Sequence, residues 1–183
     1  MSIDTLKSRL PDYAKDLKLN LGSVLTPEGA PGLSENQIHG IALASAVAAR
    51  HPETLREIAG VVREHTDEAT FKAAQAAAAI MGMNNIYYRS LHLMSDQEYL
   101  SMPAKLRMNV IGRPGVEKAD FELYSLAVSA VNGCGMCLEA HEKELRKHDL
   151  SREAVQSALR IAAVIHAVAV TLESEAALAG ETV

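Results

Sequence analysis

The chain has 183 residues, of which 48% are apolar and 4% aromatic, and it contains no tryptophan. This length and apolar content predict a globular domain with a sizeable core and exclude a disordered chain. The formal net charge is −5 and lysine and arginine form no stripe, so nucleic acid is not expected as a partner.

The chain is expected to be helical almost throughout, because no stretch alternates apolar and polar residues as a half-buried strand does. Helix limits follow from prolines that open a helix, side chains that cap it and glycines that end it. The expected helices cover residues 11–22, 34–49, 52–65, 67–81, 83–94, 103–112, 120–131, 134–148 and 152–172.

Several of these limits depend on single residues. Ser34 and Gln37 have the spacing of a capping box. Gly82 is expected to interrupt the alanine-rich helix that precedes it. Asp120 is expected to be the N-cap of a helix that Asn132-Gly133 ends.

A weak internal repeat relates residues 71–89 to residues 122–140. Each copy reads as a helix of small residues, a glycine break and a second helix, and a shift of 51 residues places Ile86 opposite Cys137. The pattern predicts an all-α protein in which residues 1–183 form a single domain of two related units, about residues 34–94 and 103–178.

The most apolar run, Ile161–Leu172, is too short to span a bilayer and is expected to be a core helix that contains His166. The N-terminal sequence MSIDTLKSRLPDYAKD has no apolar segment typical of a secretion signal. A cytoplasmic protein without a membrane partner is therefore expected. Since the last helix is apolar on most faces, part of it or of residues 67–81 is expected to be buried between subunits.

Both cysteines lie in the sequence NGCGMCLEAH, where two residues separate Cys134 from Cys137. Such a pair can form a disulfide, hold a metal or fill a core. Cytoplasmic thiols are normally kept reduced, which favours a redox or metal role over a structural crosslink. A structural zinc site usually takes four ligands, and only these two thiols and His141 are obvious. A redox CxxC is therefore preferred, with a zinc-binding or redox-sensing helical module as an alternative.

Helical spacing places both thiols and His141 on one face of the expected helix. Cys134 would lie at its N-terminus, where unpaired N–H groups and the helix dipole favour a thiolate. Cys137 would lie within reach of a disulfide after a small adjustment of the first turn, which Gly135 permits. His141 could pass a proton to or from Cys137. Glu122, in the first turn of the preceding helix, is a candidate carboxylate partner.

The spacing of Glu122, Cys134-x-x-Cys137 and His141 resembles the motif of the alkyl hydroperoxidase D (AhpD) family, part of the carboxymuconolactone decarboxylase-like superfamily of all-α proteins. The resemblance extends over nearly the whole chain. It includes the segments LPDYAKDLKLNL, AAIMGMNNIYYR, LRMNVIGRPG and ADFELYSLAVSAVNGC.

The resemblance implies a homotrimeric thiol peroxidase that reduces organic hydroperoxides through a dithiol/disulfide cycle, without a tightly bound cofactor or metal. Cys137 would attack the hydroperoxide and become a sulfenic acid. Cys134 would act as proton donor and then form the Cys134–Cys137 disulfide. Glu122 and His141 would form a proton relay. The family is also expected to reduce a peroxiredoxin partner with electrons from a dihydrolipoyl group on a carrier protein.

Two features complicate this assignment. Some family members have histidine immediately before the second cysteine, where this chain has Met136, so His141 must serve alone in the proton relay. Met136, like Met81, is otherwise interpreted as a packing residue. Helix-dipole reasoning makes Cys134 the more acidic thiol, which is compatible with the family roles if Cys134 is the more exposed of the two. A general thiol–disulfide oxidoreductase with little peroxidase activity is the alternative enzyme.

Overall fold

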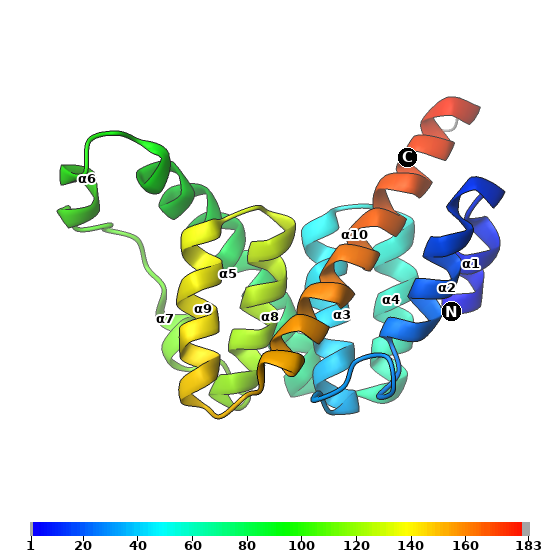
Figure 1. Cartoon of the computed structure of the whole chain (residues 1–183), viewed down its shortest axis with the longest axis horizontal. Coiled ribbons are helices and arrows are strands. Elements are labelled where there is room, and N and C mark those ends of the chain that lie inside the picture. Colours follow the sequence, from blue (N-terminus) through cyan, green and yellow to red (C-terminus); the bar gives the residue numbers. More distant parts are fainter. Residues whose placement is uncertain (1, 181–183) are drawn as a thin grey trace.

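Figure 1 shows an all-α protein, as predicted; the computed structural model describes residues 2–180, and no strand occurs among them. The elements in chain order are α1 (Ile3–Arg9), the 3₁₀ helix η1 (Asp12–Ala14), α2 (Lys15–Val24), α3 (Glu35–Ala49), α4 (Pro52–His65), α5 (Glu68–Leu93), α6 (Glu98–Ser101), α7 (Asn109–Gly112), α8 (Lys118–Val131), α9 (Gly135–Lys147) and α10 (Arg152–Ala179).

Helices with strong start signals begin where the sequence predicts. The capping box of α3 is present, since the Ser34 hydroxyl accepts a hydrogen bond from the Gln37 N–H and the Gln37 side chain accepts one from the Ser34 N–H. Pro52 occupies the first turn of α4. Ser151 caps α10 by accepting a hydrogen bond from the Ala154 N–H. These local signals are satisfied within one turn and need no tertiary contact.

The N-terminal prediction is wrong in two respects. Helix α1 was not expected, although Ser2 caps it by accepting a hydrogen bond from the Thr5 N–H. The helix expected from Pro11 to Gly22 is instead η1 followed by α2, which continues through Gly22 to Val24. A single glycine lowers helix stability without ending the helix when packing holds the flanking turns.

The same physical reason corrects the prediction at Gly82. Helix α5 runs without a break from Glu68 to Leu93, and a β-carbon added at Gly82 would meet nothing within 4 Å. The internal repeat is not confirmed, because its first copy lacks the glycine break. Ile86 is 55% exposed, whereas Cys137, its expected counterpart, is 6% exposed.

Two further helix starts differ from expectation. No helix begins at Pro103; α6 ends before it, and Met102 is extended, as a residue that precedes proline favours. Helix α8 starts at Lys118 with Glu117 as its N-cap residue, so Asp120 lies in the first turn. The Asp120 carboxylate instead accepts a hydrogen bond of 2.7 Å from the side chain of Gln37.

Helix α3 lies at the centre of the fold and packs against α4, α5, α8 and α10. A short turn joins α8 to α9, and α5 packs against both (Figure 1). The apolar core is continuous from Leu6 in α1 to Leu172 in α10. The turn between α8 and α9 is therefore held on one side by a long, well-packed helix.

Helix α10 is long and apolar enough to cross a membrane by length and composition, but half of its most apolar window is buried inside the protein. A core helix meets the same criteria. The prediction that His166 is a core residue is wrong, since its side chain is exposed. His166 shares an exposed face of α10 with Ala163 and Val170, at the spacing of one helical surface.

Close packing of α3 on α8 makes Gly40 sensitive to substitution. A β-carbon added there would lie 2.4 Å from the ring of the buried Tyr124. Gly40→Ala is expected to lower the free energy of unfolding by about 1–3 kcal/mol. Gly82→Ala is the matched control and is expected to raise it by up to about 1 kcal/mol. Urea unfolding measures both, and a Gly40→Ala protein as stable as wild type would contradict this packing.

Candidate active site

The turn between α8 and α9 is closed by a glycine and a backbone hydrogen bond. Gly133 has a φ of +67°, in the left-handed region that glycine adopts without a steric penalty. The Cys134 N–H donates a hydrogen bond of 3.0 Å to the carbonyl of Ser129 in α8. The predicted break at Asn132-Gly133 is confirmed, and Cys134 becomes the N-cap of α9.

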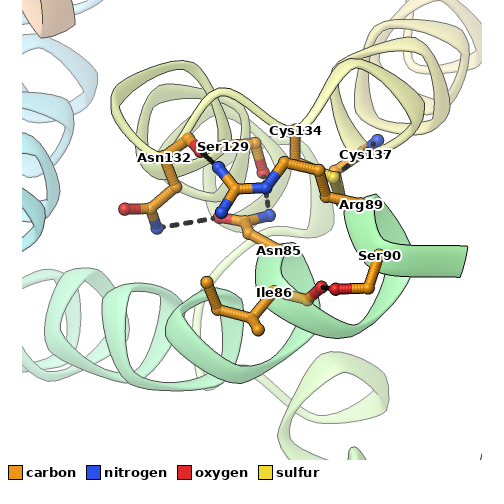
Figure 2. Close-up of a disulfide and its surroundings, with 8 residues drawn as sticks. All are labelled: Asn85, Ile86, Arg89, Ser90, Ser129, Asn132, Cys134 and Cys137. Atoms are coloured by element: carbon orange, nitrogen blue, oxygen red, sulfur yellow. Dashed lines mark hydrogen bonds between the residues drawn. A yellow bond between two sulfur atoms is a disulfide. The ribbon is translucent and has the colours of Figure 1, made fainter. Parts of the chain in front are cut away.

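The two cysteines form a disulfide across the first turn of α9 (Figure 2). Their Cα atoms lie 5.3 Å apart, which is within the usual range for a disulfide. The Cys134 sulfur also accepts a hydrogen bond of 3.3 Å from the Cys137 N–H. A sulfur in the N-cap position sits at the positive end of the helix, which lowers the free energy of a thiolate once the disulfide is reduced.

The expectation that Cys134 is the more exposed thiol is wrong for the disulfide form. Cys134 is 0% exposed, whereas Cys137 is 6% exposed. The N-cap position turns the Cys134 sulfur toward the first turn of α9, where it accepts the hydrogen bond from the Cys137 N–H. Cys137 is the member of the pair that borders a pocket.

A polar network from α5 fixes the turn beside the disulfide (Figure 2). The Asn85 side chain donates a hydrogen bond of 2.8 Å to the Ser129 hydroxyl and accepts one of 3.0 Å from the Asn132 side chain. The Arg89 guanidinium donates to the Asn132 carbonyl. These contacts join α5 to the end of α8 and to the turn that leads into α9.

Glu122 and His141, the pair that the family resemblance implies, meet across the α8–α9 pair. The Nδ1 atom of His141 lies 2.6 Å from Oε2 of Glu122. The other carboxylate oxygen, Oε1, lies 3.1 Å from Nζ of Lys118, one turn earlier on α8. Both members of the pair are shielded from solvent, since the side chains of Glu122 and His141 are 7% and 12% exposed.

The charges around Glu122 keep its carboxyl ionised. Burial by itself raises the pKa of this group, but the hydrogen bonds and charges of His141 and Lys118 outweigh it, so the pKa of Glu122 is lowered. Whenever the imidazole is neutral, the ionised Glu122 holds the ring proton on Nδ1, and Nε2 is then the basic nitrogen. A histidine held in this way can accept or donate a proton at Nε2.

A pocket of about 230 Å³ borders Cys137 and His141. Most of its other lining side chains are apolar, and they come from α5, α7 and α9. The complete lining is Met81, Asn84, Tyr88, Ile111, Met136, Cys137, Ala140 and His141. An apolar pocket with a thiol and an imidazole in its wall suits a small organic molecule with a polar reacting group.

Comparison with known proteins identifies the family of this chain. Residues 97–180 match the Carboxymuconolactone decarboxylase family. The chain is 59% identical over 181 residues to alkyl hydroperoxide reductase AhpD of Rhodospirillum centenum, covering 99% of this chain and 96% of the relative. The chain belongs to the AhpD family. The AhpD proteins of Streptomyces coelicolor and Hyphomonas neptunium are 56% and 58% identical, each over 99% of this chain and over 100% and 99% of the relative.

The fold brings together all four residues that the AhpD motif singled out. Cys134 and Cys137 are joined by the disulfide, Cys137 and His141 line one pocket, and Glu122 contacts His141 from α8. Within residues 2–180, no group of three or more histidine, cysteine or acidic residues is arranged to hold a metal ion.

Sequence reasoning missed several residues of this site. Lys118 could have been found from its position one helical turn before Glu122. Asn84, Tyr88 and Ile111 carried no local signal, because they come from other helices and reach the thiols only through tertiary packing. Met136, interpreted as a packing residue, is half-buried and lines the pocket directly.

Proposed function

We propose that this AhpD family member is an alkyl hydroperoxide reductase that works through Cys134 and Cys137. The observation that carries the proposal is a disulfide whose Cys137 borders an apolar pocket that it shares with His141. An apolar wall suits the alkyl part of a hydroperoxide, and a thiol is the reductant that its oxygen–oxygen bond requires.

In the proposed reaction, the Cys137 thiolate attacks the terminal oxygen of the hydroperoxide. A sulfur–oxygen bond forms, the oxygen–oxygen bond breaks, and the alkoxide leaves as an alcohol after it takes a proton, which Cys134 supplies. Cys137 is then a sulfenic acid. The Cys134 sulfur then attacks the Cys137 sulfur, a sulfur–sulfur bond forms, the sulfur–oxygen bond breaks, and the hydroxide leaves as water with the proton that His141 took from Cys137. One hydroperoxide and two thiols thus give one alcohol, one water and one disulfide.

The Glu122–His141 pair is proposed to activate Cys137. With Glu122 ionised and bonded to Nδ1, Nε2 of His141 accepts the thiol proton, and the imidazolium that forms is stabilised by the carboxylate. Lys118 holds Glu122 on its other oxygen and keeps the carboxylate in place. Met136 has no proton to transfer, so the relay uses His141 alone.

The reductive half of the cycle is proposed to use a dithiol. A dihydrolipoyl group on a carrier protein would supply two electrons and two protons, and the reduced enzyme would pass them on to a peroxiredoxin partner as well as to hydroperoxide. We place this cycle in the cytoplasm, where thiols are kept reduced. Because Cys134 is fully buried, attack on its sulfur requires the first turn of α9 to open, whereas Cys137 is reached through the pocket.

Turnover of cumene hydroperoxide with dihydrolipoamide, glutathione and dithiothreitol as alternative reductants tests the proposed function. We expect peroxide consumption that is fastest with dihydrolipoamide. A protein that reduces disulfide substrates but leaves the hydroperoxide unchanged would instead be a general thiol–disulfide oxidoreductase. Zinc that copurifies with the wild type and is lost in Cys134→Ser would favour a metal-binding module.

The chain is also proposed to form a homotrimer. Residues 92–103 are all exposed, and α6 lies away from the rest of the fold in Figure 1. Leu93, Tyr99 and Met102 in this segment are 74%, 43% and 59% exposed. Such an apolar surface, with the exposed face of α10 that includes Val170, is typical of a subunit contact. Light scattering at micromolar concentration is expected to give three times the chain mass, and a monomer would contradict the assembly.

A further inference from the structure

Asn84 is a buried polar residue in the wall of the pocket beside Cys137. It lies on α5 between Met81 and Tyr88, which line the same pocket one turn to either side. Asn84 is 4% exposed. Its Oδ1 atom is buried and has no hydrogen-bond partner among residues 2–180.

The neighbouring Asn85 has a structural role in the same helix and serves as a comparison for Asn84. Its side chain donates to Ser129 and accepts from Asn132, so both ends of the amide are used. Asn85 thereby connects α5 to the turn between α8 and α9. Asn84 makes no corresponding connection through Oδ1, although it is almost as deeply buried. A role in holding the helices together therefore does not account for Asn84.

The physical chemistry of burial favours an apolar side chain at this position. A buried amide oxygen without a partner lowers the free energy of unfolding relative to a paired one. Leucine would fill a similar volume among Met81, Tyr88 and Ile111 without that loss. An unpaired amide beside a reactive thiol is the kind of group that a polar ligand pairs with.

We infer that Asn84 binds the two oxygen atoms of the hydroperoxide and is a further catalytic residue of this site. The inference rests on the proposed function. The amide oxygen accepts a hydrogen bond from the terminal O–H of the substrate, the oxygen that Cys137 attacks. The amide N–H donates to the inner oxygen, which gains negative charge as the oxygen–oxygen bond breaks. One side chain thus orients the substrate and stabilises the leaving alkoxide.

The test compares two reactions of Cys137 in the reduced full-length protein. The first is oxidation by cumene hydroperoxide. The second is reaction with methyl methanethiosulfonate, which has no O–H or N–H to bind. Asn84→Leu is expected to slow the first by about tenfold or more and to change the second less than twofold. Its melting temperature is expected to equal or exceed that of the wild type, because an unpaired buried amide is removed.

Asn36→Ala is the matched control. It removes the hydrogen bond of 2.9 Å that the Asn36 side chain donates to the Thr70 hydroxyl of α5, and neither residue lines the pocket. It is expected to lower the melting temperature and to leave the ratio of the two rates at the wild-type value. If Asn84→Leu does not fold, Asn84→Ala is measured in the same two reactions, with the same expected change in the ratio of the rates.

Three outcomes would overturn the inference. An unchanged oxidation rate in Asn84→Leu would show that the amide does not contact the peroxide. An equal loss in both reactions would show that Asn84 sets the reactivity of the thiol instead. A wild-type protein that cumene hydroperoxide does not oxidise would overturn the proposed function and this inference together, whereas the first two results leave the proposed function intact.

Discussion

Cys137→Ser is expected to abolish hydroperoxide reduction, whereas Cys134→Ser is expected to stop the cycle after its first step. Cys137 borders the pocket and is the attacking residue. The Cys134→Ser variant retains Cys137 but lacks the thiol that resolves the sulfenic acid. A sulfenic acid should therefore accumulate at Cys137 and be trapped by dimedone. Peptide mass spectrometry after treatment with one equivalent of hydroperoxide locates the label.

The reverse pattern would exchange the roles of the two cysteines. Cys134 is the N-cap of α9, where the helix dipole favours its thiolate, but its sulfur is covered in the disulfide form. A stable sulfenic acid at Cys134 in Cys137→Ser, with none at Cys137 in Cys134→Ser, would contradict the assignment. It would mean that the stability of the thiolate at the helix N-terminus, and not access through the pocket, decides which cysteine attacks the hydroperoxide. Unfolding by urea should be similar for the two reduced variants, which separates chemistry from folding.

Removal of either member of the Glu122–His141 pair is expected to slow peroxide reduction by about 10²-fold or more. Glu122→Gln keeps the shape of the side chain but removes the negative charge that fixes the tautomer of His141. His141→Ala removes the base itself. Stopped-flow oxidation of the reduced protein by hydroperoxide measures both. Wild-type rates in both variants would make the pair structural.

Glu144→Gln provides a matched control for Glu122→Gln. Glu144 lies on α9, pairs with Lys147 at the surface and does not line the pocket, so its replacement is expected to leave the oxidation rate unchanged. The pH dependence gives a second readout. Because the pKa of Glu122 is lowered, its carboxylate stabilises the fold above its ordinary pKa of about 4.5, and this contribution is lost as the pH falls through the folded-state value. The stability difference between wild type and Glu122→Gln should therefore shrink only in acid.

Local capping signals predicted much of the fold. The starts of α3, α4 and α10 follow from Ser34, Pro52 and Ser151, whose effects act within one turn. Glycine and proline inside the chain were less informative. Gly82 lies within α5 because contacts of that helix with α8 and α9 outweigh its weak helix propensity. Such contacts are not visible in a local pattern.

The residues of the candidate site were likewise only partly predictable from local sequence patterns. Helical spacing alone places Cys134, Cys137 and His141 on one face, because they belong to α9 and its N-cap. Glu122 required the additional step that α8 and α9 pack face to face. Asn84 reaches the pocket from α5, more than 40 residues earlier in the chain, and only the packed structure brings it to Cys137. Tertiary contacts therefore supply the part of the pocket wall that comes from α5 and α7, while α9 supplies Cys137 and His141.

The most direct measurement of the proposed chemistry is the intact mass of the protein after a single turnover. Fully reduced wild type is mixed with one equivalent of cumene hydroperoxide in the absence of any other thiol. The account predicts the loss of two hydrogens per chain, a disulfide that peptide mapping assigns to Cys134 and Cys137, and one equivalent of the corresponding alcohol. An unchanged mass with intact hydroperoxide, or an added oxygen without a Cys134–Cys137 disulfide, would contradict it.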